Sequence, residues 1–133
     1  MATEERKGRA YAFFQQPKPG SEIEKKLFDE LPDAREMANL PAGMKVDLMR
    51  IKDLKGDAAL MGLKADALSY QNTHVLEGTL SGATSEETAK QVRDVVANLC
   101  NVPGLWERRQ PFVGGIAFWN DDIGEYDMLP TGF

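Results

Sequence analysis

The chain has 133 residues, of which 42% are hydrophobic and 28% are charged, and its formal net charge is −5. This balance excludes a disordered or collagen-like chain and is typical of one globular domain, so we expect a single domain over residues 1–133. The negative charge argues against nucleic acid as a partner, because affinity for a phosphate backbone comes from clustered Lys and Arg.

The N-terminal part of the chain predicts a strand followed by a helix. Residues 10–14 are apolar and aromatic, which favours a strand. Ser21 and Glu24 have the spacing of a capping box, and apolar residues recur every four positions after them. We expect this helix to end near Pro32 and a separate short helical turn to follow from Asp33.

Residues 44–81 predict three consecutive strands in an antiparallel meander. In the first of them, apolar residues alternate with Lys45 and Asp47, which indicates a strand with one wet face. A change of phase at its end indicates a bulge. Residues 59–67 alternate in a similar way and predict the second strand, and residues 73–81 predict the third.

The C-terminal part predicts an amphipathic helix and a buried strand. Thr84 and Glu87 form a second capping box, and the helix that follows has an apolar stripe of Ala89, Val92, Val95, Val96 and Leu99. Residues 112–119 are apolar on both faces, as in a buried strand. We expect residues 1–8 and 121–133 to be partly disordered tails.

The resulting order is strand, helix, three strands, helix, strand. Two helices inserted among largely antiparallel strands can bury their apolar stripes on the same face of one sheet. We therefore expect an α+β two-layer sandwich, ferredoxin-like with an extra strand. The opposite face of that sheet would be left to solvent or to a partner.

Few features of the sequence indicate a cellular compartment or a bound cofactor. Cys100 is the single cysteine, which excludes an intrachain disulfide, and its place at a helix end favours a buried structural residue. The start of the chain lacks the apolar run of a secretory signal, and no stretch reaches the ~18 apolar residues of a membrane helix. We expect a cytoplasmic protein without membrane contact, metal or cofactor.

His74, the only histidine, is the one weak candidate for catalysis. Alternation places it on the same face as Leu76 and Leu80, which favours a packed core histidine over an acid or base. Four carboxylates between residues 121 and 127 lack the spacing of a calcium loop, so we interpret them as a solvated acidic turn. No phosphate-binding or nucleophile motif is present.

Aromatic and glycine residues near the C-terminus are the candidate binding residues. Aromatic side chains dominate both pockets and interfaces, and glycines admit a neighbour close to the backbone, although an ordinary core would use the same residues. The set consists of Trp106, Phe112, Phe118, Trp119, Gly114 and Gly115. Alternation places Phe118 and Trp119 on opposite faces of their strand, so one of them faces away from the helices.

The leading functional hypothesis is a small binding or interaction module that self-associates through its sheet face, as a homodimer or another homo-oligomer. A small apolar ligand is the other partner that the aromatic set could hold. The alternative is a cofactor-independent enzyme of the dimeric α+β barrel type, in which His74 or a carboxylate moves a proton within an apolar pocket. A deep pocket containing His74 would favour the enzyme, and a flat apolar patch would favour the module.

Overall fold

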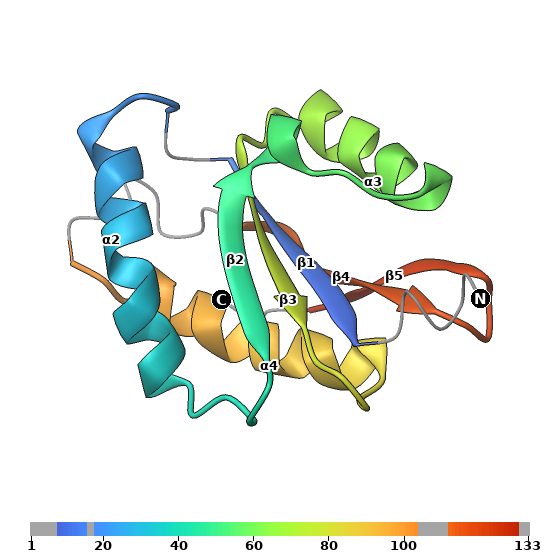
Figure 1. Cartoon of the computed structure of the whole chain (residues 1–133). Helices are drawn as coiled ribbons and strands as arrows, with labels where there is room; N and C mark the ends of the chain where they lie inside the picture. The colour runs from blue at the N-terminus through green and yellow to red at the C-terminus, as the bar shows by residue number, and fades with distance from the viewer. Residues whose placement is uncertain (1–7, 16–17, 104–111, 131–133) are drawn as a thin grey trace.

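The computed structural model describes residues 8–15, 18–103 and 112–130, and these form a five-stranded antiparallel sheet with three α-helices (Figure 1). The elements in chain order are β1 (Arg9–Phe14), α2 (Glu22–Met37), β2 (Lys45–Arg50), the short 3-10 turn η1 (Ile51–Asp53), α3 (Ala58–Ser69), β3 (His74–Thr79), α4 (Ser85–Cys100), β4 (Phe112–Asn120) and β5 (Glu125–Leu129). The expected α+β class is confirmed.

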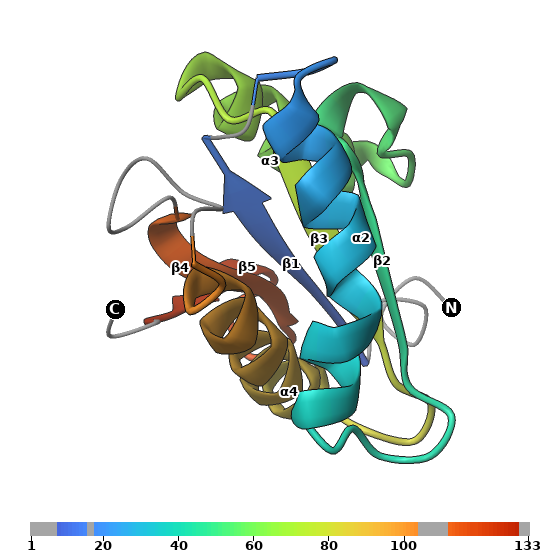
Figure 2. The same ribbon diagram turned by 90° about the vertical axis from the view of Figure 1, so that its left-hand side faces the viewer.

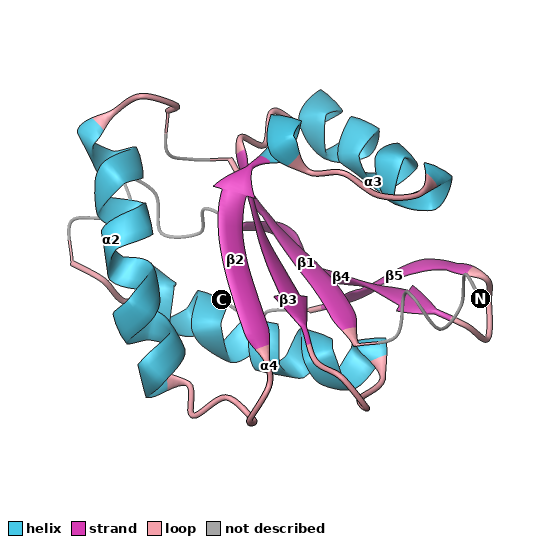
Figure 3. Cartoon of the chain, in the orientation of Figure 1, coloured by secondary structure: helices cyan, strands magenta, loops and turns pink. Residues whose placement is uncertain are grey.

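The strand order in the sheet is β2-β3-β1-β4-β5, and every neighbouring pair is antiparallel. Helices α2 and α4 lie side by side over one face of this sheet, which we call the α2–α4 face (Figures 1 and 2). Helix α3 lies on the opposite side, which we call the α3 face (Figure 3). The sheet therefore carries helices on both faces.

The larger part of the core lies between the sheet and the α2–α4 pair. The predicted stripe of α4 points inward, with Val92, Val95, Val96 and Leu99 fully buried. Helix α4 approaches the sheet closely at Gly78, where an added Cβ atom would collide with the side chain of Val92. A capping box between Thr84 and Glu87 begins this helix, as the sequence predicts. The N-terminus and inward face of α4 thus follow from local pattern.

Residues 59–67, which we predicted to be a strand, form most of helix α3. The segment is rich in Ala, Leu and Met, which are strong helix formers, and it lacks β-branched residues. The side chain of Asp57 caps the helix by accepting a hydrogen bond of 2.9 Å from the backbone N–H of Leu60. The alternation was misleading because Lys64 and Asp66 are the only polar residues in this segment, and two residues define a period of two poorly. The predicted meander of three strands is therefore wrong.

Two smaller predictions are also corrected. Pro32 lies inside α2, and the chain from Glu22 to Met37 is one continuous helix. Pro32 is exposed, so water can solvate the carbonyl that its missing N–H leaves unpaired. The change of phase after β2 is the turn at Ile51–Asp53, and the β2–β3 register runs without a bulge.

The acidic segment near the C-terminus is ordered in part as β5. Residues 125–129, which we expected in a partly disordered tail, pair with β4, and Gly124 takes a left-handed conformation in the tight turn between the two strands. In the described part of the chain, no helix is long and apolar enough to cross a membrane.

Candidate functional site

Helix α3 covers one end of the α3 face. Leu60 and Ala67 of the helix are buried in an apolar cluster with strand residues that include Phe13 and Val75. Phe13, near the end of β1, and Val75, near the start of β3, are direct cross-strand partners. Figure 1 shows α3 over the end of the sheet where β1 ends and β3 begins. We expected the face of the sheet opposite the two helices to be left entirely to solvent or to a partner, and this expectation is wrong. The other end of this face is what remains open.

The open end of the α3 face carries two rows of side chains that run across the strands. In the first row, which we call the basic row, Lys45 of β2, Thr79 of β3 and Arg9 of β1 are direct cross-strand partners. In the second row, which we call the acidic row, Asp47 of β2 and Glu77 of β3 are partners. Lys45, Arg9 and Asp47 are exposed. The two signs of charge are thus separated into neighbouring rows.

This charge pattern is not neutralised within one copy of the chain. None of the four charged side chains has an ion-pair partner among the described residues. Asp47 and Glu77 are directly opposite on adjacent strands, an arrangement of like charges that destabilises a sheet. The acidic row therefore presents a local excess of negative charge that a cation from outside would stabilise.

On β4 and β5 the aromatic residues Trp119 and Tyr126 continue the basic row, and Ala117 and Met128 continue the acidic row. Trp119 is the partner of Tyr126, and their rings meet edge to face with centroids 5.3 Å apart. Tyr126 also packs edge to face on Tyr11 at 6.3 Å. Met128 lies next to them and is 42% exposed. The open end of the face is therefore charged over β2, β3 and β1 and apolar over β4 and β5.

Tyr11 lies beneath this surface as a neutral phenol. Burial raises its pKa above the ordinary value, and the neighbouring Glu77 carboxylate raises it further, although a hydrogen bond from Arg9 acts in the other direction. Tyr11 is 2% exposed. It supports the surface but cannot titrate near neutral pH.

The structure separates the six predicted binding residues. Phe118 is buried in the core of the α2–α4 face, whereas Trp119 lies on the α3 face. Gly115 is needed for the β4–β5 pairing, because an added Cβ atom would collide with the backbone carbonyl of Leu129. The side-chain surroundings of Phe112 and Gly114, and all of Trp106, lie outside the described residues.

His74 belongs to a buried polar cluster between α2, β2 and β3. Its Nε2 lies 2.6 Å from Oε2 of Glu24, and its Nδ1 lies 2.7 Å from the hydroxyl of Thr73. Arg50 donates two hydrogen bonds to the same carboxylate, from Nε at 2.8 Å and from Nη2 at 2.7 Å. The backbone N–H of Gly20 donates another, at 2.9 Å. All four acceptor positions of the Glu24 carboxylate are thus occupied.

The hydrogen bonds and burial fix the charge states of this cluster. The Arg50 guanidinium lowers the pKa of Glu24 to about 2, even though burial acts against the charged form. Burial lowers the pKa of His74 below its ordinary value, and Glu24 offsets this only in part. The lowered pKa favours an uncharged His74 at neutral pH, and the Glu24 carboxylate then favours the tautomer whose Nε2–H donates to it.

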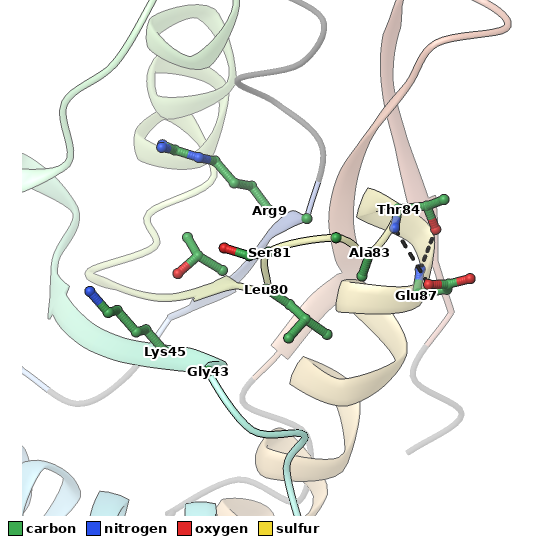
Figure 4. A pocket seen from close by; sticks show the side chains of 11 residues that line it. Arg9, Gly43, Lys45, Leu80, Ser81, Ala83, Thr84 and Glu87 are labelled. Atoms are coloured by element: carbon green, nitrogen blue, oxygen red, sulfur yellow. Dashed lines mark hydrogen bonds between the residues drawn. The ribbon is translucent and has the colours of Figure 1, made fainter.

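Three surface cavities of the described part of the chain lie away from this cluster, and the fully buried His74 lines none of the three. One of them, with a volume of about 780 Å³, lies where β1 begins and β3 ends, and its lining includes Arg9, Lys45 and Ser81 (Figure 4). In Figure 4 these three side chains point away from α4, whereas Leu80 points toward it. This cavity is polar and does not match the expected apolar pocket.

The remaining candidates are accounted for by local contacts. Asp121 accepts a hydrogen bond from Nε1 of Trp119, and Asp127 accepts one from Asn120 across the β4–β5 turn. No group of His, Cys, Asp and Glu in the described part of the chain has the geometry of a metal site. Cys100 packs against the core of the α2–α4 face, and burial raises its pKa to about 12.

Only part of this site can be predicted from the sequence. Alternation of Lys45 and Asp47 indicated the wet face of β2, but their pairing with residues of β1 and β3 depends on the register. Glu24 was assigned only to a capping box, and Arg50 had no role. Comparison of the chain with known protein families, with curated proteins and with solved structures gave no match.

Proposed function

We propose that this chain is a small interaction module that self-associates through the open end of the α3 face. The supporting observation is the combination, on one sheet surface, of an unneutralised charge pattern with an apolar patch in which the half-buried Trp119 and Tyr126 lie beside the exposed Met128. Contiguous apolar surface of this kind, next to segregated charges, marks a site for a protein partner. The proposal now rests on half of one face, because α3 covers the rest.

Helix α3 also supports an interaction role. It is apolar around most of its circumference, a composition that usually belongs to a buried helix. Yet only Leu60 and Ala67 are buried, while Leu68 is 47% exposed and the adjoining Tyr70 is 66% exposed. A partner that packs beside α3 would cover this surface.

Several finer expectations stand as proposals beside the main one. The order β2-β3-β1-β4 with two helices on one face supports a ferredoxin-like arrangement in which β5 is the extra strand. The single cysteine supports a cytoplasmic location.

The rival function, a cofactor-independent enzyme of the dimeric α+β barrel type, has less support. A general acid or base must reach the proton that it transfers. Both ring nitrogens of His74 are engaged by Glu24 and Thr73, and the side chain is fully buried. Glu24 is saturated with hydrogen bonds. The arrangement suits a structural tie between α2 and the sheet.

The patch is small, which sets the expected affinity. Five strands about 4.8 Å apart make it about 20 Å wide, and its two rows are only about 7 Å apart along the strands. Such a surface is well below the ~800 Å² per partner of stable complexes, so we expect a weak dimer with a micromolar dissociation constant.

Sedimentation equilibrium of the full chain from 5 to about 200 µM tests the proposal. We expect reversible dimers, and we expect Met128→Lys to weaken association at least tenfold, because it places a charge in the aromatic patch. Met37→Lys is the matched control, since Met37 is 70% exposed on α2, away from the α3 face. A wild-type chain that stays monomeric throughout, or equal effects of the two substitutions, would overturn the proposal.

A further inference from the structure

We propose a specific arrangement for this self-association: two copies pack with their α3 faces together, related by a two-fold axis that lies between the basic and acidic rows and runs parallel to them. This inference rests on the proposed function and names the partner as a second copy of the chain. It follows from the places of the charged and aromatic side chains in the sheet.

The first step is the geometry of the rows. Side chains on one face of a strand are about 7 Å apart along the strand, and neighbouring strands are about 4.8 Å apart. The rows thus lie side by side, with Lys45 and Asp47 two residues apart on β2 and Thr79 and Glu77 two residues apart on β3. A rotation of 180° about a line between the rows exchanges them. The basic row of each copy then faces the acidic row of the other.

The second step is the choice of axis. A symmetric face-to-face dimer needs a two-fold axis within the plane of the interface. An axis along the strands keeps each row opposite itself, so an axis that passes between β2 and β3 would place Asp47 of one copy opposite Glu77 of the other, which adds like-charge repulsion to the pair that each copy already contains. Only an axis along the rows brings Lys45 opposite Asp47. The strands of the two sheets then run antiparallel.

The aromatic patch selects the same axis independently. Rotation about the rows keeps each strand opposite its own counterpart, so β4 and β5 of one copy meet β4 and β5 of the other. Tyr126 then faces Met128 of the second copy, because these residues occupy the two rows on β5. An axis along the strands through β1, the middle strand, would instead place the apolar Tyr126 and Met128 opposite Lys45 and Asp47 of β2. Charge and apolar surface therefore agree on one arrangement.

A charge-exchange experiment tests this arrangement. The acidic variant carries Arg9→Glu and Lys45→Glu, and the basic variant carries Asp47→Lys and Glu77→Lys. Each variant alone has two rows of one sign, so we expect its self-association to weaken at least tenfold. An equimolar mixture restores opposite signs across the interface, so we expect heterodimers with affinity near that of the wild type, measured by sedimentation velocity and by energy transfer between labelled variants.

The controls separate folding from association. The basic variant replaces one cross-strand pair of like charges by another, so its folding cost is comparable to that already present, and circular dichroism of both variants checks this. Lys90→Glu on the exposed side of α4 is the matched charge control. Two results would overturn this arrangement while leaving the proposed function standing, provided that the wild type forms dimers. One is unchanged self-association of both variants, and the other is the absence of heterodimers in the mixture. A monomeric wild-type chain would overturn both.

Discussion

His74 and Glu24, fifty residues apart in the chain, are joined by a hydrogen bond of 2.6 Å between Nε2 and Oε2. This bond ties the first turn of α2 to the start of β3, and Arg50 ties the same carboxylate to the end of β2. A neutral imidazole and a saturated carboxylate therefore hold three elements together at one end of the sheet. Two predictions about stability follow from their charge states.

The first prediction concerns the pH dependence that His74 introduces. Its pKa is lowered in the folded chain, so below about pH 6.5 the unfolded chain binds a proton that the folded chain does not. Stability must then fall as the pH decreases from 7.5 to 5.5, by at most about 1.4 kcal/mol per pH unit. Urea unfolding at several pH values measures this slope, and His74→Gln should flatten it.

The titration itself can be followed directly. His74 is the only histidine, so one imidazole signal in a proton NMR spectrum reports its protonation. We expect a midpoint below 6.5. A midpoint above that value would mean that Glu24 outweighs burial and that the imidazole is charged at neutral pH.

The second prediction concerns Glu24. Glu24→Gln removes the charge that Arg50, His74 and Gly20 surround, and we expect the free energy of unfolding at pH 7 to fall by about 2–4 kcal/mol. Glu22→Gln is the matched control, because Glu22 lies in the same helical turn but is exposed, and it should cost less than about 0.5 kcal/mol. If both variants lost the same free energy of unfolding, the loss would come from removing a negative charge at the N-terminus of α2 and not from the cluster around Glu24.

Acid should act on the same carboxylate. The pKa of Glu24 is about 2 in the folded chain against 4.5 ordinarily, so its contribution is complete above about pH 4.5 and disappears as the pH falls toward 2. Wild type should therefore lose more stability over this interval than Glu24→Gln does. Parallel acid titrations followed by circular dichroism compare the two.

The third prediction tests the helical nature of residues 58–69. Gly62 has open space where a Cβ atom would lie, so Gly62→Ala should stabilise the chain by up to about 1 kcal/mol through helix propensity. Gly20 has equally open space but a φ of +81°, so Gly20→Ala should destabilise by about 1 kcal/mol. Thermal or urea unfolding of both variants measures the difference. A loss of stability in Gly62→Ala would contradict a helix at this position.

The fourth prediction concerns Cys100. Because burial raises its pKa to about 12, little thiolate is present at pH 8, and we expect alkylation by iodoacetamide at least a hundredfold slower than in urea-unfolded chain. Mass spectrometry of timed samples gives both rates. Rapid alkylation of the folded chain would contradict the structural role that we assign to this thiol.

The sequence by itself determined the elements whose signals are local. The capping box at Thr84 and the apolar stripe that follows it specify α4, because both depend only on residues within one helix. The aromatic run that forms β1 and the alternation that forms β3 are also local, and both strands were found. These elements are enough to establish an α+β chain.

Only the tertiary structure decided what local pattern leaves open. In residues 59–67 only Lys64 and Asp66 are polar, so the period of the apolar residues cannot by itself separate a strand from a helix there. Packing on Phe13 and Val75 completes the helix. The partners of His74, and the rows that place Lys45 beside Thr79 and Asp47 beside Glu77, depend on strand register. Register is set by long-range pairing, which brings together residues that no short stretch of sequence contains.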